Sequence, residues 1–181
     1  MKLIRSIVSA LVITALLLGV IWGAYTLFPL KYLDEIRLFS AQMELDPYLV
    51  TALIKAESNF GEGAVSRADA KGVMQLTDDT ALFCAQKLNM ELKEGDIYSP
   101  HINIRLGTFY LKRMLSLFDG DESLAVAAYN AGEGRVREWL KNPEYSTDGE
   151  SLENIPYGET KRHVEKIKMY KKVYKLLYPN I

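Results

Sequence analysis

The sequence predicts one all-helical domain preceded by a single membrane-spanning helix. An uncharged, largely apolar run extends from Ser6 to Phe28 at the N-terminus. After this run, apolar residues recur at spacings of three and four in one segment after another, which is the period of an amphipathic helix. No stretch has the alternation of a strand, except for short pieces near Gly72 that could form a very small β element.

The uncharged run is long enough to cross a bilayer. As a helix it would extend about 34 Å, and the hydrocarbon core is about 30 Å thick. Trp22 and Tyr25 suit the far interface, while Lys2 and Arg5 favour an N-terminus inside the cell. A cleavable signal peptide usually has a shorter apolar core followed by small residues at the cleavage site, and this run ends without a clear pair of them.

These features and the composition predict the domain organisation and exclude several kinds of site. We expect an uncleaved anchor over residues 1–29 and one domain over residues 30–181 outside the cytoplasm; secretion after cleavage is the alternative. The formal net charge of −1 gives no case for nucleic acid. The single cysteine, Cys84, excludes an internal disulfide and reads as a small buried residue. Because His101 and His163 are far apart in the sequence, no metal is expected.

The helix predicted over residues 47–58 has the clearest boundaries. Asp46 is a good N-cap and Pro47 suits the first helical position. Apolar residues cover most of its circumference, so we expect it to be buried. The other predicted helices cover residues 30–43, 77–88 with Thr77 or Asp78 as cap, 99–118 with Ser99 as cap, 123–129, 135–140 and 157–178, with loops over 59–72 and 141–156.

Three further features of the sequence indicate tertiary contacts or binding. Gly107 within a helix costs about 1 kcal/mol relative to alanine, which indicates close approach by another helix or by backbone. A buried Gln75 would need hydrogen-bond partners, some of which a bound sugar could supply. The lysines of helix 157–178 could contact anionic lipid or wall polymer, although a solvated helix face is the simpler interpretation.

Glu57 is the candidate catalytic residue. It stands at the C-terminal end of an apolar helix, where the helix dipole and desolvation both disfavour its negative charge. A carboxyl group that stays protonated near neutral pH can act as a general acid in the cleavage of an acetal, because the leaving sugar oxygen must receive a proton. The alternative is that Glu57 simply faces solvent at a helix end.

Four stretches together are similar to a known family. They are Ala-Glu-Ser-Asn-Phe at residues 56–60, Gly-Val-Met-Gln-Leu at 72–76, Ala-Ala-Tyr-Asn-Ala-Gly-Glu-Gly-Arg-Val at 127–136 and Ile-Pro-Tyr-Gly-Glu-Thr at 155–160. In this order and spacing they resemble the lytic transglycosylase domain of the soluble-transglycosylase (SLT) type. This domain belongs to the lysozyme-like superfamily, which also contains goose-type lysozymes. The resemblance extends from about residue 32 to the C-terminus.

The resemblance implies an all-helical, lysozyme-like fold with a cleft for the glycan strands of peptidoglycan. It implies that Glu57 is the single catalytic acid and base, that Ser66 polarises the N-acetyl group of the substrate and that Tyr129 contacts the catalytic carboxylate. It also implies that Met74 and Gln75 line the cleft. The full set of substrate-binding residues that it implies is Ser66, Met74, Gln75, Tyr129, Asn130 and Glu159.

The reaction that the resemblance implies cleaves the bond between N-acetylmuramic acid and N-acetylglucosamine. The N-acetyl oxygen attacks C1 while Glu57 protonates the leaving oxygen, and the C6 hydroxyl then closes a 1,6-anhydro ring. No cofactor is required. A muramidase that admits water to the same cleft is one alternative, and a non-catalytic scaffold that binds peptidoglycan is another. The sequence identifies no protein partner.

This chain departs from the usual family pattern at three places. Thr77 and Asp78 stand where methionine and proline are common, Asp69 stands where glycine is frequent, and Glu133 replaces a common proline. The first departure lies close to the expected binding site for the anhydro sugar.

Overall fold

The structure is a computed structural model that describes the backbone of residues 1–181 and the side chains of all but residues 2 and 3. The described backbone forms eight α-helices and one short 3₁₀ helix, and contains no strand. Two isolated β-bridges pair Val65 with Lys71 and Lys71 with Leu76, close to Gly72. The all-helical prediction is therefore confirmed.

The chain divides into two compact units, residues 1–30 and residues 31–181. The first unit consists mainly of α1 (Lys2–Leu27). Within it, Ile4–Leu27 has a mean hydropathy of 2.4 and is long and apolar enough to cross a membrane, judged by length and composition. Lys2, one of the two charges from which we predicted the orientation of this helix, has a side chain outside those that the structure describes.

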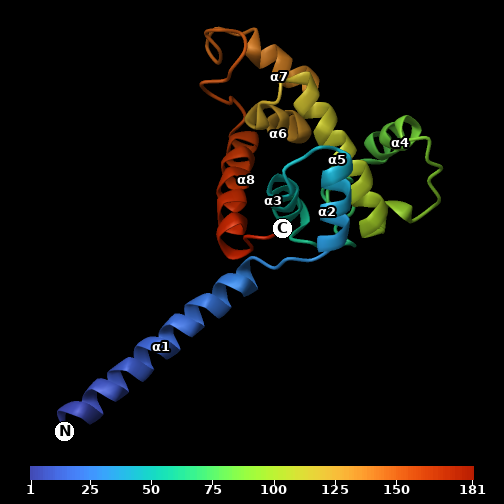
Figure 1. The fold of residues 1–181 in the computed structure, drawn as a ribbon. Helices are drawn as coiled ribbons and strands as arrows, with labels where there is room; N and C mark the ends of the chain where they lie inside the picture. The colour runs from blue at the N-terminus through green and yellow to red at the C-terminus, as the bar shows by residue number, and fades with distance from the viewer. The chain divides into compact units, whose positions relative to one another are not determined.

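The second unit contains the remaining helices (Figure 1). They are α2 (Leu33–Gln42), α3 (Pro47–Ser58), α4 (Asp78–Lys87), α5 (Pro100–Leu117), α6 (Glu122–Ala131), α7 (Glu133–Leu140) and α8 (Gly158–Leu177). Each lies where the apolar periodicity predicts a helix, and α3 has the predicted bounds. The 3₁₀ helix η1 (Asp96–Tyr98) was not predicted, because one short turn leaves no periodic pattern.

Side-chain caps mark where three of these helices, α3, α4 and α6, begin. The side chain of Asp46 accepts a hydrogen bond from the backbone N–H of Tyr48 at 2.9 Å, as predicted. Thr77 caps α4 by accepting a hydrogen bond from the N–H of Thr80. Ser99 is the N-cap residue of α5 and Pro100 its first residue, as predicted, but the Ser99 side chain accepts no capping hydrogen bond.

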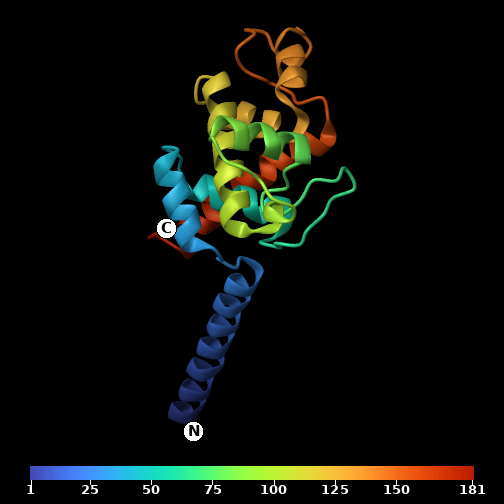
Figure 2. The same ribbon diagram turned by 90° about the vertical axis from the view of Figure 1, so that its right-hand side faces the viewer.

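The core is organised around α3, which packs along α8 (Figures 1 and 2). Six consecutive α3 residues, Leu49–Ile54, are buried, so this helix is surrounded by the rest of the unit. From α8, Val164, Ile167 and Tyr174 are buried. Each large apolar side chain buried in this way contributes about 1.5–3 kcal/mol. Cys84 is also fully buried, as predicted, and burial raises the pKa of its thiol to about 12.

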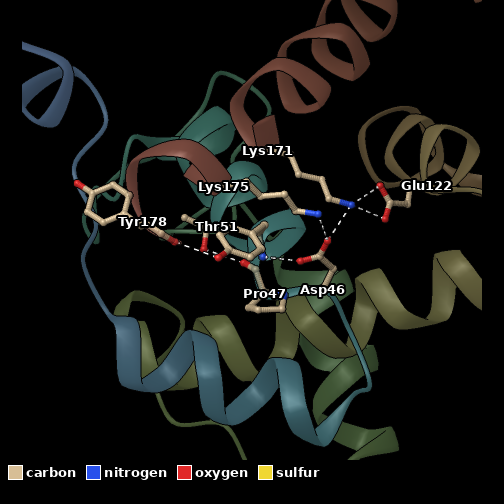
Figure 3. A network of polar contacts seen from close by, with 8 residues as sticks. Asp46, Pro47, Thr51, Glu122, Lys171, Lys175 and Tyr178 are labelled. Atoms are coloured by element: carbon tan, nitrogen blue, oxygen red, sulfur yellow. Dashed lines mark hydrogen bonds and ion pairs between the residues drawn. The ribbon is translucent and has the colours of Figure 1, made fainter. Parts of the chain in front are cut away.

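A network of charged groups joins the start of α3 to α6 and α8 (Figure 3). The ammonium group of Lys171 on α8 lies 2.9 Å from Asp46 and donates to both carboxylate oxygens of Glu122, at 2.6 and 2.8 Å. Lys175 lies 3.3 Å from the same oxygen of Asp46. Since α3 begins at Asp46 while Lys171 and Lys175 lie near the end of α8, the two helices run antiparallel.

The charge of Asp46 makes this network sensitive to acid. Burial raises the pKa of Asp46, but hydrogen bonds from Lys171 and from the N–H of Tyr48 outweigh burial and lower it below its ordinary value of 3.8. A carboxylate with a lowered folded-state pKa stabilises the fold above its unfolded-state pKa. This contribution disappears as the pH falls through the folded-state value.

We therefore predict that Asp46→Asn destabilises the domain at neutral pH by up to about 1 kcal/mol, because asparagine keeps the cap and removes the ion pairs. In strong acid the variant and the wild type should unfold at the same urea concentration. Near-ultraviolet circular dichroism of the full-length chain in detergent measures both midpoints. A difference that is the same at both pH values would contradict the prediction.

Candidate active site

Two cavities meet at Glu57. The first, of about 580 Å³, is lined by all of the predicted site residues except Met74, namely Glu57, Ser66, Gln75, Tyr129, Asn130 and Glu159. The second, of about 470 Å³, lies along the end of α3 and is lined in part by Lys166 and Tyr170 of α8. Because Glu57, Ser66 and Gln75 line both cavities, there is open space on two sides of the Glu57 carboxyl group.

The chain leaves α3 immediately after Glu57. Asn59 and Phe60 both have left-handed backbone conformations, with φ of 53° and 64°, which turn the chain out of the helix. The ring of Phe60 is buried, and the hydroxyl of Ser58 donates to the carbonyl of Val73 at 2.8 Å. These contacts attach the following loop to the end of α3. Glu57 is thereby held in the last turn of a rigid helix.

The immediate partner of Glu57 is a histidine. Oε1 of Glu57 lies 3.2 Å from Nε2 of His163 on α8, and the two side chains are only 14% and 12% exposed. The charge of Glu57 also acts on Tyr129. Burial raises the pKa of Tyr129 well above its ordinary value, and the nearby negative charge of Glu57 adds to the increase. Glu57 therefore lies in a largely dry environment.

Tyr129 lies differently from the prediction that it contacts the carboxylate. Its hydroxyl donates to the backbone carbonyl of Met74 at 2.9 Å. Its side chain lines the first cavity and interacts electrostatically with Glu57, but its one proton is committed to the backbone. Tyr129 thus connects α6 to the loop that carries Gln75.

That loop is fixed by Asn103 of α5, which is fully buried. The Asn103 amide donates to the carbonyls of Lys71 and Ile97 at 3.1 and 2.8 Å, and its oxygen accepts from the N–H of Met74 at 2.7 Å. Gly72 has a φ of +76°, and a Cβ there would lie 2.4 Å from the Asn103 amide nitrogen. The sequence gives one signal for this role, an amide within an otherwise apolar helical stretch.

Gln75 and Met74 point in different directions. Gln75 is half-buried, and its amide nitrogen donates to the backbone carbonyls of Gly72 and Ala64, at 2.8 and 3.1 Å. The side chain of Met74 is fully buried, lines neither cavity and covers Gly107. The expected close approach at Gly107 therefore exists, but the predicted cleft position of Met74 does not hold for its side chain.

Ser66 is oriented by its own loop. Its hydroxyl oxygen accepts hydrogen bonds from the N–H groups of Ala68 and Ala70, at 3.2 and 3.0 Å. A serine hydroxyl has two acceptor positions and one donor, so these two bonds leave the O–H as the group available to a ligand. Ser66 lines both cavities beside Glu57, and we call these two cavities together the groove. The O–H donor of Ser66 therefore lies in the groove.

Asn130 and Glu159 form another part of the first cavity. The buried hydroxyl of Thr160 donates to the side-chain oxygen of Asn130 at 2.8 Å, which leaves the Asn130 amide N–H groups for a ligand. Glu159 lies in the first turn of α8, where the helix dipole stabilises a negative charge. Among the described side chains, no group of three or more His, Cys, Asp or Glu could hold a metal ion.

The three departures from the family pattern have local explanations. Asp69 has a φ of 59°, a conformation that glycine adopts freely and aspartate tolerates. Glu133 is the first residue of α7, where proline is also favoured, and it forms a 2.9 Å ion pair with Arg113. Thr77 lines the first cavity, whereas Asp78 pairs with Lys71 and lies outside it.

Comparison with known proteins shows what this architecture resembles. A family model described as the transglycosylase SLT domain matches residues 36–151. The soluble lytic murein transglycosylase of Escherichia coli K12 is 31% identical over 151 residues, which cover 82% of this chain and 23% of that protein. The membrane-bound lytic murein transglycosylase C of Shigella sonnei is 29% identical, over 80% of this chain and 46% of that protein.

Solved structures show the same similarity. The lytic transglycosylase Slt of Pseudomonas aeruginosa, solved as an inactive glutamate-to-glutamine mutant, superposes with a TM-score of 0.75 at 34% identity, covering 82% of this chain and 24% of that one. A 70-kDa soluble lytic transglycosylase in complex with bulgecin A gives 0.78 at 27% identity, covering 92% and 28%. This chain thus spans about a quarter of the length of these soluble relatives.

The contact between Met74 and Gly107 generates a prediction with a matched control. A Cβ at Gly107 would lie 2.4 Å from the Met74 sulfur and 2.8 Å from its Cβ, so Gly107→Ala forces this buried side chain to move. We expect a loss of about 1–3 kcal/mol in unfolding free energy. Gly134→Ala, also within a helix but with nothing within 4 Å, should instead stabilise by about 0.5–1 kcal/mol. Urea unfolding of both variants measures the opposite signs.

Proposed function

The chain belongs to the SLT transglycosylase domain family, and from this premise we propose that it is a lytic transglycosylase of peptidoglycan. The proposed reaction cleaves the β-1,4 bond between N-acetylmuramic acid and N-acetylglucosamine and leaves a 1,6-anhydro end. One observation carries the proposal: Glu57 is a mostly buried carboxyl group that lines both cavities. A glycan lying through this groove would pass directly over it.

In the proposed mechanism Glu57 acts twice. As the bond between C1 and the leaving oxygen breaks, the protonated carboxyl group gives its proton to that oxygen, and the N-acetyl oxygen of the same sugar bonds to C1. The Glu57 carboxylate then removes the proton of the C6 hydroxyl, whose oxygen replaces the N-acetyl oxygen at C1. Glu57 ends the cycle protonated, so no external proton or cofactor is consumed. Attack within one sugar benefits from a high effective concentration.

The other groove residues support this sequence of steps. The O–H of Ser66 is free to donate to the N-acetyl group, because its oxygen already accepts two backbone hydrogen bonds. Gln75, whose amide nitrogen is bound by backbone carbonyls, is held in one orientation and exposes its oxygen as an acceptor for sugar hydroxyls. Asn130 offers donors and Glu159 acceptors in the first cavity, and Tyr129 forms part of its wall.

We further propose that α1 anchors the enzyme in the membrane and that residues 31–181 act on the extracytoplasmic side. The length and hydropathy of Ile4–Leu27 support the anchor. A relative whose name describes it as membrane-bound supports membrane association as well. Glycan strands of the wall are then the substrate within reach.

A muramidase is the second candidate, and a specific observation favours it. Glu159 lines the same cavity as Glu57, and a retaining hydrolase commonly uses two carboxyl groups about 5–5.5 Å apart. In that reaction water, rather than the C6 hydroxyl, would complete the cleavage.

Product analysis separates these two functions. We predict that the full-length chain in detergent releases, from purified peptidoglycan, muropeptides with 1,6-anhydro ends, which are lighter by one water than the hydrolysed ends and have no reducing group. Mass spectrometry with and without borohydride reduction identifies them. Reducible ends as the only product would replace the proposal by the muramidase, and the absence of any released product would leave a binding scaffold.

We predict that Glu57→Gln folds normally and loses at least about 10²–10⁴-fold in activity, because one group serves as both acid and base. Glutamine keeps the size and the hydrogen-bonding shape of the side chain and removes the proton transfer. The matched control is Glu165→Gln, which changes an exposed glutamate of α8 that lines neither cavity and should keep full activity. The rate of turbidity loss of a peptidoglycan suspension measures both. Near-normal turnover by folded Glu57→Gln would refute the mechanism.

A further inference from the structure

His163 has no role in the reaction as described above, yet it lies beside Glu57, with Nε2 at 3.2 Å from Oε1. We propose that His163 is the positioning residue of the catalytic carboxyl group. It holds Oε1 so that Oε2 faces the scissile bond, and it stabilises the carboxylate between the two proton transfers. This inference rests on the proposed function of Glu57.

The surroundings of the imidazole leave Glu57 as the partner of its Nε2. Nε2 of His163 is buried and makes no aligned hydrogen bond to any described group, although it lies within ion-pair distance of Glu57. A buried polar atom without a partner is unfavourable, and Oε1 of Glu57, at 3.2 Å, is within reach of this one. Catalytic hydrogen bonds are often poorly aligned before substrate binds and tighten in the complex.

The backbone around His163 is fixed on every side. One turn earlier, the buried hydroxyl of Thr160 is bonded to Asn130 of α6. The next residue, Val164, is buried in the core, and Lys166 donates to the carbonyl of Ala56 at 3.4 Å. α8 is therefore bonded to α6 before His163 and to α3 after it, which gives the imidazole a defined position relative to Glu57. A positioning role requires this rigidity.

The protonation state of the pair determines what Glu57 can do. A neutral imidazole with its proton on Nε2 donates to Oε1, so the acidic proton of Glu57 must reside on Oε2, the oxygen left for the substrate. After that proton moves to the leaving oxygen, the same hydrogen bond becomes charge-assisted and stabilises the carboxylate. The neutral pair thus supports both halves of the reaction.

A protonated imidazole would not support the second half of the reaction. An imidazolium beside the carboxylate would hold the negative charge so strongly that Glu57 becomes a poor base for the C6 hydroxyl. Imidazole ordinarily gains its proton as the pH falls from about 8 to 5. If the imidazole acts in this way, the fall of activity at acid pH, which is the acid limb of the pH profile, depends on the side chain at position 163.

Other charged and titratable groups face the pair from each neighbouring element. Tyr129 comes from α6, and its raised pKa, caused by burial and then by Glu57, keeps its hydroxyl neutral. On α8 itself, Glu159 lies one turn before His163 and Lys166 one turn after it. Arg67 of the loop lines the first cavity. Tyr129 therefore does not titrate in the range of imidazole.

The experiment compares His163→Gln and His163→Leu in the full-length chain, with His101→Gln as the matched control. Glutamine keeps a neutral N–H donor without the titration, whereas leucine removes both. His101 lies against Phe39 and lines neither cavity. Initial rates of muropeptide release from purified peptidoglycan across the pH range give kcat and KM for each variant.

We expect His163→Leu to lose about 10²-fold in kcat with little change in KM, because a misplaced carboxyl group reacts poorly while the glycan still binds. His163→Gln should stay within about 10-fold of wild type and lose the acid limb of its pH profile. His101→Gln should keep that limb. An unchanged acid limb in His163→Gln, or wild-type kcat and pH profile in His163→Leu, would overturn the role of His163.

Two further comparisons keep the outcome decisive. If His163→Leu does not fold, as judged by near-ultraviolet circular dichroism, the acid limb of His163→Gln alone decides the question. If Glu57→Gln is inactive while both His163 variants match the wild type, only the role of His163 fails. If Glu57→Gln retains activity, the proposed function fails first, since His163 would then have no catalytic group to position.

Discussion

The antiparallel packing of α3 on α8 is the constraint on which the rest of the structure depends. The register of the two helices is marked at both ends, by Asp46 with Lys171 at one end and by Glu57 with His163 at the other. Between them lie the fully buried residues of the core. Polar contacts of this kind add modest stability and favour one alignment of the two helices over others. The position of Glu57 thus follows from contacts made about one helix length away.

The opposite wall of the groove is built without a sheet. One buried amide, Asn103, donates to the carbonyls of Lys71 in the loop and Ile97 in η1 and accepts from the N–H of Met74. The loop itself makes only isolated β-bridges, and the hydroxyl of Tyr129 adds a further contact to it. The side chain of Met74 packs against Gly107 of α5, so the loop is held by packing as well as by hydrogen bonds. Two side chains that line neither cavity, Asn103 and Met74, therefore help to hold the loop that carries Gln75.

The sequence was sufficient for features that arise within one segment. Apolar spacing located the helices, and Asp46 and Pro47 marked the start of α3, because caps and periodicity act over a few residues. It was insufficient for contacts between distant segments, and both His163 and Asn103 owe their importance to such contacts. Met74 shows a further limit: it belongs to a motif beside the groove, but the motif does not specify whether its side chain or its backbone faces outward.

The open space on both sides of Glu57 has a consequence for the topology of the substrate. A blind pocket admits only the terminus of a chain, whereas a trough with two exits admits a polymer anywhere along its contour.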